Sequence, residues 1–331
     1  MKYRPLGDTG LRVSEIGFGT WGLGGDRGGA IAYGPASDEA SRAALHAAFD
    51  VGINFFDTAD LYGFGHSEEL LGEVFSPRRE SVVIATKGGF ENNGRQDFSP
   101  DHLCRALDAS LRRLRTSYVD LYQLHNPSMV TLREHPEIVE LMGKLRTTGK
   151  IRAWGVSARS PEEAFEAIEE FTAPCVQVNF NLTDQRAITN GLFDLCQQRH
   201  IGVIARTPLC FGFLTGKYAM DSSFTATDHR RSWPARQLQR WREANNVFGF
   251  LFDANPSNTP AQLALRFCLS FPAVSTAIPG MLTDVHAREN AAASDCGPLL
   301  SEQLQRSIQL GTTTEFFINR AIPTARDAHS L

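Results

Sequence analysis

Short apolar runs alternate with longer amphipathic segments along most of the chain. The runs are rich in β-branched and aromatic residues, which is typical of buried strands. We expect eight strands, at residues 15–20, 52–56, 82–86, 118–124, 151–156, 175–180, 201–206 and 273–278. The intervening segments repeat apolar residues at helical spacing, as Leu103, Leu107 and Leu111 do, and they predict helices that cover the strands.

Three of the expected helices begin with a clear capping signal. Ser99, Ser160 and Thr259 each stand directly before a proline, so a hydroxyl cap is followed by the residue that suits the first helical position. Glu163 and Gln262 lie three residues after the second and third caps, and this spacing predicts capping boxes.

The alternation predicts an α/β fold with a parallel sheet. A closed (β/α)8 TIM barrel, forming a single domain over residues 1–331, is the most economical arrangement, and a doubly wound open sheet is the alternative. Two segments interrupt the repeat. Residues 3–14 predict an N-terminal β-hairpin that could plug the bottom of the barrel. Residues 207–258 predict a long loop after strand seven, and a connection of that length is usually functional or disordered.

Composition narrows the possible partners and the cellular location. A net charge of −4 and a pI near 6.2 give no basic surface for nucleic acid or an anionic membrane. The N-terminus has no signal-peptide core, and no apolar run reaches the ~18 residues that a membrane span needs. The six cysteines are dispersed, without a CxxC or Cys/His cluster. We therefore expect a cytoplasmic protein with neither disulfides nor a metal site.

Four polar side chains follow three neighbouring strands, at the end of a barrel where active sites lie. Asp57, Lys87 and His125 end strands two, three and four, and Tyr62 lies just beyond the first of them. A buried Lys87 needs a counter-ion, which Asp57 can supply. The lysine charge is expected to lower the pKa of Tyr62, so that the phenol exchanges a proton near neutral pH while His125 orients a carbonyl oxygen. The alternative is a purely structural Asp57–Lys87 ion pair.

Seven motifs, in order and at the right distances, then point to one family. They are FFDTADLYGFGHSEELLG, ATKGG, LYQLHNP, WGVS, QVNFNL, TPLCFGFLTGK and IPG…ARENAAA. With them the chain resembles the aldo-keto reductases from about residue 3 to residue 295. The resemblance implies an NAD(P)H-dependent reductase of a small-molecule carbonyl substrate. It makes Tyr62 the proton donor, Lys87 and Asp57 the pair that tunes it, and His125 the residue that positions the carbonyl.

The resemblance also implies cofactor contacts in four groups. Residues near the nicotinamide ring are Gly19, Thr20, Trp21 and Asp57, and those that bond its carboxamide are Ser157 and Gln177. Residues that cover the pyrophosphate are Thr207, Pro208, Leu209, Gly212 and Lys217, and those at the adenosine end are Gly280, Glu289 and Asn290.

The chain departs from the family pattern at three places. Arg206 stands where many members stack a tyrosine on the nicotinamide, and Ala158 replaces a frequent asparagine. Residues 280–282 offer no base for a 2′-phosphate, which leaves His286 or Arg288 as candidates. The expected cofactor is NADPH, with NADH possible.

Two other functions remain open alongside the reductase. One is a nucleotide-sensing regulatory subunit that resembles the potassium-channel β-subunits. The other is a Schiff-base enzyme with Lys87 as the amine nucleophile. Substrate identity is left to the loops at 22–36, 125–135 and 218–250 and to residues 315–321. Within them, Arg230 and Arg231 are expected either to contact a phosphate or carboxylate or to be solvated.

Overall fold

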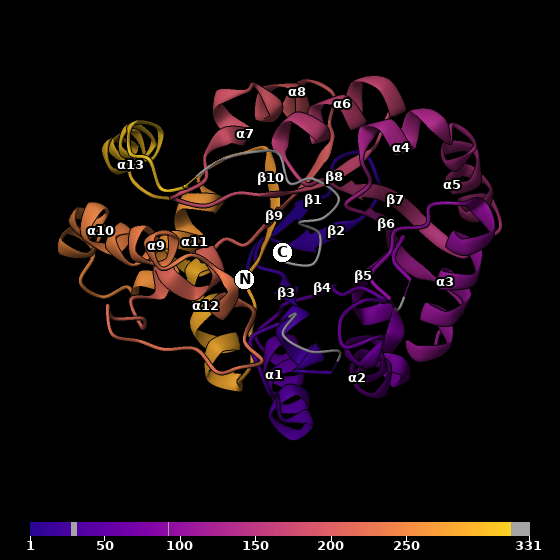
Figure 1. Cartoon of the computed structure of the whole chain (residues 1–331), viewed down its shortest axis with the longest axis horizontal. Helices are drawn as coiled ribbons and strands as arrows, with labels where there is room; N and C mark the ends of the chain where they lie inside the picture. The colour runs from indigo at the N-terminus through magenta and orange to yellow at the C-terminus, as the bar shows by residue number, and fades with distance from the viewer. Residues whose placement is uncertain (28–31, 92, 319–331) are drawn as a thin grey trace.

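The computed structural model describes residues 1–27, 32–91 and 93–318, and its centre is one sheet of eight strands (Figure 1). In chain order the strands are β3 (Phe18–Gly19), β4 (Phe55–Asp57), β5 (Val83–Gly88), β6 (Val119–His125), β7 (Ile151–Ser157), β8 (Cys175–Asn179), β9 (Gly202–Arg206) and β10 (Val274–Ile278). Each strand pairs in parallel with the next. The sheet closes where Ile16 bridges Ala277 and the Gly17 N–H donates to the Ala277 carbonyl at 2.8 Å. The predicted barrel is confirmed, and the open sheet is wrong.

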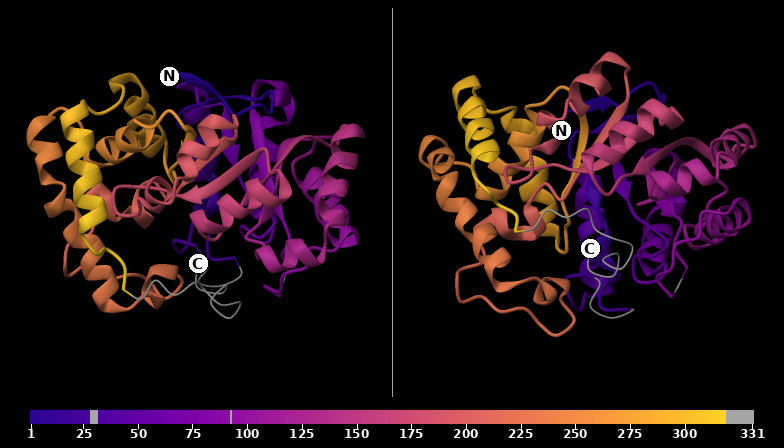
Figure 2. Two further views of the ribbon diagram at one scale, coloured as in Figure 1. Left: turned by 90° about the horizontal axis from the view of Figure 1, so that it is seen from above. Right: turned by 45° about the horizontal axis from the view of Figure 1, so that its top comes forward.

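Helices surround the strands, as Figure 2 shows from two further directions. They are α1 (Asp38–Asp50), α2 (His66–Phe75), α3 (Pro100–Arg113), α4 (Met129–Glu134), α5 (Glu137–Thr147), α6 (Pro161–Phe171), α7 (Arg186–Thr189), α8 (Leu192–Gln198), α11 (Pro260–Leu269) and α12 (Asp284–Cys296). Leu103, Leu107 and Leu111 of α3 are buried, as their spacing predicted.

All three predicted caps form, but only one of the two predicted capping boxes does. Thr259 and Gln262 bond each other's backbone N–H groups reciprocally at the start of α11. At the start of α6, Ser160 accepts from the Glu163 N–H. The Glu163 carboxylate instead accepts from the N–H and guanidinium of Arg159. The second box is therefore wrong, because a charged partner next to the cap takes the carboxylate.

The predicted N-terminal hairpin is present as β1 (Tyr3–Pro5) and β2 (Arg12–Ser14), which pair antiparallel. Leu6 and Leu11 between its strands are buried in one apolar cluster with interior residues of the barrel such as Phe55. A Cβ on Gly202, the first residue of β9, would lie 2.8 Å from Leu6 Cγ. The hairpin therefore covers the amino ends of the strands and leaves the carboxyl ends for chemistry.

The long connection after β9 is mostly ordered into helices. It contains two 3₁₀ turns, η3 (Cys210–Thr215) and η4 (His229–Ser232), and the helices α9 (Ala235–Val247) and α10 (Gly249–Ala254). Trp241 of α9 is fully buried and packs against Phe213 and Trp233, at ring-centroid distances of 5.6 and 4.8 Å. The last helix of the described residues is α13 (Ser301–Thr313). Of the expected substrate segments, residues 28–31 and 319–321 lie outside the described residues.

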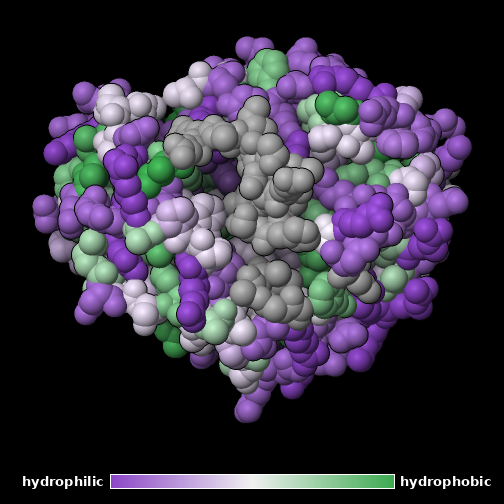
Figure 3. All heavy atoms as spheres, viewed as in Figure 1, coloured by the Kyte–Doolittle hydropathy of each residue, from purple (hydrophilic) through white to green (hydrophobic). Residues whose placement is uncertain are grey.

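The face seen in Figure 3 is hydrophilic over most of its area, with apolar residues in small separate groups. Within the described residues, no helix is both long enough and apolar enough to cross a membrane.

Candidate active site

The carboxyl ends of β4 and β5 bring three of the four predicted catalytic residues into contact. Lys87 is completely buried, and its Nζ donates to Asp57 Oδ1 at 2.5 Å and to the Thr58 carbonyl at 2.9 Å. A third contact joins Lys87 Nζ to Tyr62 Oη at 3.2 Å. The ammonium thus lies between a carboxylate and a phenol, as the order of strand ends predicted.

Asp57 accepts hydrogen bonds from other side chains in addition to Lys87. Its Oδ2 accepts from the amide nitrogens of Gln123 at 3.0 Å and Gln177 at 2.7 Å, and both glutamines are buried. Gln123 was not among the residues predicted from the sequence. The signal was available, since residues two apart on a strand face the same side and Gln123 precedes His125 by two. Gln177 was expected to bond the carboxamide of the cofactor. Its amide nitrogen donates to Asp57 and to Gln123, and its amide oxygen accepts a hydrogen bond from the Ser157 hydroxyl at 3.5 Å.

His125 ends β6 beside the phenol. Its ring lies edge-on to Tyr62 and to Phe90, at centroid distances of 6.0 and 5.0 Å. Its Nδ1 is buried without a hydrogen-bond partner among the described residues. Burial, together with the charges of Lys87 and Arg206, lowers the pKa of His125 well below its usual value. The imidazole is therefore neutral at pH 7 and can offer one N–H to a carbonyl oxygen.

The Tyr62 phenol differs from the sequence-based expectation in the direction of its pKa. Burial raises the pKa of Tyr62 above its ordinary value, and the opposing effect of Lys87 does not offset it. The predicted lowering is therefore wrong, because desolvation of a phenolate outweighs one nearby cation. Burial also opposes the charge on Lys87, but Asp57 and Tyr62 together raise the pKa of that ammonium. The resting site thus pairs a protonated phenol with a charged lysine.

Arg206 is the last residue of β9, and hydrogen bonds from all three of its guanidinium nitrogens hold the side chain in place. Its Nε donates to Asn179 Oδ1 at 2.8 Å, and its Nη1 donates to Asn126 Oδ1 and Ser157 Oγ, both at 3.0 Å. Its Nη2 donates to the Ala158 carbonyl at 2.9 Å. All four acceptors are neutral, and neither asparagine was predicted as a partner from the sequence. The hydrogen bonds use the edges of the plane, so stacking on a flat ring is compatible with them.

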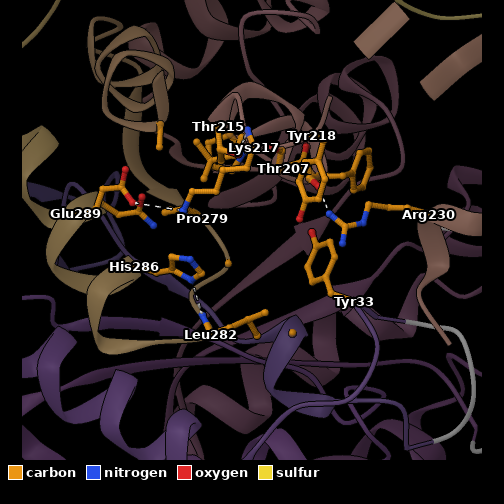
Figure 4. Close-up of a pocket in the computed structure, with 18 residues that line it drawn as sticks. Tyr33, Thr207, Thr215, Lys217, Tyr218, Arg230, Pro279, Leu282, His286 and Glu289 are labelled. Carbon is orange, nitrogen blue, oxygen red and sulfur yellow. Dashed lines mark hydrogen bonds and ion pairs between the residues drawn. The ribbon is translucent and has the colours of Figure 1, made fainter. Parts of the chain in front are cut away.

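A cavity of about 310 Å³ has Thr207, the residue after Arg206, in its lining, and Figure 4 shows the residues around it. Nine of the predicted cofactor residues line it, namely Thr207, Pro208, Leu209, Gly212, Lys217, Gly280, His286, Glu289 and Asn290. The other predicted contacts, Gly19, Thr20, Trp21, Asp57, Ser157, Gln177 and Arg206, are not among its lining residues. All of these except Gln177, which is the third residue of β8, lie at or just beyond the carboxyl end of a strand. The Thr20 hydroxyl donates to the Asp57 carbonyl at 2.9 Å.

Nine further residues line the cavity without having been predicted as cofactor contacts, among them Tyr33 and Arg230. Tyr33 and Arg230 meet there, with the guanidinium carbon 4.8 Å from the tyrosine ring centroid. Arg230 is only 6% exposed and pairs with Asp228 at 2.6 Å, so the solvated alternative for this arginine is wrong. The backbone of Asp228 also forms isolated β-bridges with Ala32 and Tyr33. The loop after β3 and the connection after β9 therefore meet beside the cavity.

The described residues contain no group of three or more His, Cys, Asp or Glu side chains that could hold a metal ion. All six cysteines are free.

Comparison with known proteins gives consistent matches. The profile of the aldo/keto reductase family matches residues 15–310. A Schizosaccharomyces pombe protein named aldo-keto reductase yakc, with NADP(+) in its name, is 34% identical over 296 residues, which cover 85% of this chain and 84% of that protein. A probable voltage-gated potassium channel subunit beta of Oryza sativa subsp. japonica is 32% identical over 328 residues, covering 93% and 96%. The solved glycerol dehydrogenase AKR11B4 of Gluconobacter oxydans superposes with a TM-score of 0.79 at 28% identity, covering 96% and 98%.

Proposed function

This chain belongs to the aldo/keto reductase family, and from that premise we propose that it is an NAD(P)H-dependent oxidoreductase that reduces an aldehyde or ketone to an alcohol. The observation that carries the proposal is the contact of the Tyr62 phenol with the buried Lys87 ammonium at 3.2 Å. A phenol held this way stays protonated until negative charge develops on a carbonyl oxygen beside it.

The residues of the chain have separable roles in this proposal. When bound, the nicotinamide supplies a hydride to the carbonyl carbon. Tyr62 donates its proton to the carbonyl oxygen, and Lys87 then lies against the phenolate that remains. The neutral His125 donates a hydrogen bond to the same oxygen. Together these groups are preorganised around the developing charge, so little reorganisation is needed during the reaction.

The lining of the cavity supports binding of the pyrophosphate and adenosine parts of the cofactor. It includes the proposed pyrophosphate residues, such as Gly212 and Lys217, together with Glu289 and Asn290. Gly212 has a φ of +92°, and a Cβ there would lie 3.0 Å from the Tyr218 ring. Only glycine therefore suits this position without strain. The name of the S. pombe relative supports NADP(H) as one cofactor.

Replacement of Tyr62 by phenylalanine tests the proposal directly. Tyr62→Phe should lower kcat for carbonyl reduction at least about 100-fold, the usual loss of a general acid, without weakening cofactor binding. Tyr122→Phe is the matched control, because that phenol is fully buried and donates to the Leu103 carbonyl at 3.2 Å. If Tyr62→Phe reduces carbonyls as fast as the control does, the role given to Tyr62 is refuted.

Suitable substrates for this assay span several carbonyl classes. Aldehydes, ketosugars and quinone-like ketones form the core of the screen. Glyceraldehyde is added because the Gluconobacter oxydans neighbour is named a glycerol dehydrogenase. We also propose a cytoplasmic location, supported by the six free cysteines.

A regulatory subunit is the second candidate, favoured by the likeness to the rice channel subunit. Such a protein would keep the cofactor but turn over only marginally. Slow oxidation of bound cofactor in a single turnover, without a steady-state rate on any substrate class, would favour it. A Schiff-base enzyme is disfavoured because Lys87 Nζ already contacts Asp57, Thr58 and Tyr62 as a charged ammonium.

A further inference from the structure

The end of the cavity proposed to hold adenosine carries little positive charge that is free to bind an anion. In Figure 4, Lys217 and Glu289 face each other, and Lys217 Nζ lies 4.0 Å from Glu289 Oε2. The remaining cation of the lining is Arg230, which is already paired with Asp228 at 2.6 Å. Among the described lining residues, each cation therefore has a carboxylate beside it.

The amino end of α12, which borders this part of the cavity, is also already occupied. Thr283 Oγ1 accepts the His286 N–H at 3.2 Å, and Asp284 places a carboxylate in the first turn of the helix. His286 Nδ1 accepts from the Leu282 N–H at 3.4 Å. An anion at this helix end would meet the Asp284 charge, although a free amino end of a helix normally attracts anions.

Neither residue that the sequence left as a candidate 2′-phosphate ligand compensates for this. Burial and the charge of Lys217 lower the pKa of His286, so its imidazole is neutral near pH 7. Arg288 is exposed and does not line the cavity. Leu282, whose backbone N–H contacts His286, places a half-buried apolar side chain on the cavity wall.

We propose that the protein binds NADH more tightly than NADPH, with Leu282 and Glu289 as the residues that set this preference. The inference rests on the proposed function and reverses the order expected from the family resemblance. A 2′-phosphate adds nearly two negative charges. Here it would face Glu289 without a cation of its own, whereas a free 2′-hydroxyl can donate a hydrogen bond to that carboxylate.

Binding titrations with four probes test the preference without relying on turnover. NADH and NADPH are titrated into the whole protein, followed by ADP-ribose and its 2′-phosphorylated form, which lack the nicotinamide. The Kd should be larger for the phosphorylated member of each pair, and by a similar factor. Tighter or equal binding of the phosphorylated member overturns the inference and leaves the proposed function intact. If neither NADH nor NADPH binds, the proposed function fails as well.

Substitutions test whether Leu282 and Glu289 set the preference for NADH over NADPH. Leu282→Arg should tighten NADPH binding about tenfold, the effect of one charge-assisted hydrogen bond, and change NADH binding little. Val285→Arg is the matched control, because Val285 is 64% exposed on α12, three residues after Leu282, and does not line the cavity, so the same charge is added outside it. Equal tightening by both variants overturns the assignment of Leu282. Glu289→Gln, which keeps the shape of the side chain, should lower the NADPH-to-NADH Kd ratio, and an unchanged ratio overturns the role of Glu289.

Discussion

Lys87 Nζ lies 2.5 Å from Asp57 Oδ1, and both side chains are buried. Two opposite charges this far from water stabilise each other, but each would be costly alone. Asp57 keeps two further donors, Gln123 and Gln177, whereas the lysine depends on this carboxylate for its charge partner. The pair is therefore the electrostatic support of the phenol and a point at which stability and function are coupled.

Removing the ammonium should affect both properties. Lys87→Met leaves the Asp57 carboxylate buried without its cation and should lower the free energy of unfolding by about 3 kcal/mol. It should also raise the apparent pKa in the pH profile of residual alcohol oxidation, because the charge of Lys87 opposes part of the rise that burial causes in the pKa of Tyr62. Denaturant unfolding and a pH–rate profile measure the two effects. Lys144→Met is the control, since its pair with Glu140 at 2.8 Å is exposed and should cost less than about 1 kcal/mol. A Lys87→Met protein with wild-type stability and an unshifted profile would contradict the coupling.

Asp60, two residues before Tyr62, is a second acid that burial affects. Its Oδ1 is buried without a partner among the described residues, and burial raises the pKa of Asp60 to about 8, with Glu68 adding repulsion. Between pH ~4 and pH 8 the folded state holds a proton that the unfolded state has lost, so stability falls as pH rises through this window. Asp60→Asn should reduce this pH dependence of the unfolding free energy by up to about 1.4 kcal/mol per pH unit. The variant protein should be more stable than wild type at pH 9.

Unfolding curves between pH 5 and 9 measure this, with Asp221→Asn as an exposed control. A variant whose stability follows the wild-type curve throughout would show that Asp60 is ionised and solvated in the folded protein.

His229 should make the protein sensitive to acid. It packs against Trp21, Tyr33 and Phe211, and both ring nitrogens are buried without partners among the described residues. Burial lowers the pKa of His229 to about 4. Below the unfolded pKa of about 6.5 the unfolded chain binds a proton that the folded chain does not, so stability is lost as pH falls toward 4. His229→Phe keeps the aromatic contacts and should reduce this loss by about 1.4 kcal/mol per pH unit.

The measurement is denaturant unfolding between pH 4.5 and 7. His46→Phe, at an exposed position of α1, is the control and should leave the slope unchanged. Equal slopes for wild type and His229→Phe would mean that the imidazole is already protonated in the fold.

Strand ends could be predicted from sequence because a parallel barrel collects its carboxyl ends at one mouth. Asp57 and His125 each end a strand, and Lys87 is one residue from the end of another, which was enough to expect their proximity. The helix starts at Ser99 and Thr259 were equally readable, because a cap is a local contact.

The partners of these residues could not be read in the same way. Lys87 pairs in register with Gln123, and Asn179 pairs with Arg206. Such pairs depend on the stagger of the strands around the barrel, which no single segment of sequence contains. The direction of the Tyr62 pKa was also missed, because it depends on depth of burial. The order of strand ends along the chain predicts which residues belong to the site, but the register of neighbouring strands determines which of them are in contact.

The charge of Arg206 should bias the cofactor toward its reduced form. Its four hydrogen-bond acceptors are neutral, so the positive charge is not compensated by a carboxylate in these contacts. If the guanidinium stacks on the nicotinamide, it repels the oxidised ring, which is a cation, and not the neutral reduced ring. Two unit charges about 4 Å apart interact by roughly 4 kcal/mol at an effective dielectric near 20, and a quarter of that favours the reduced form about fivefold.

Titration of oxidised and reduced cofactor into wild type and Arg206→Tyr measures this bias. The ratio of oxidised to reduced Kd should fall about fivefold in the variant, because tyrosine keeps the stacking surface and removes the charge. Arg199→Tyr is the control, since Arg199 is half exposed and paired with Glu169 at 2.6 Å, and it should leave the ratio unchanged. If Arg206→Tyr also leaves the ratio unchanged, the guanidinium does not lie on the ring. Its four hydrogen bonds would then hold the carboxyl ends of β6, β7 and β8 to β9, and the substitution would only lower stability.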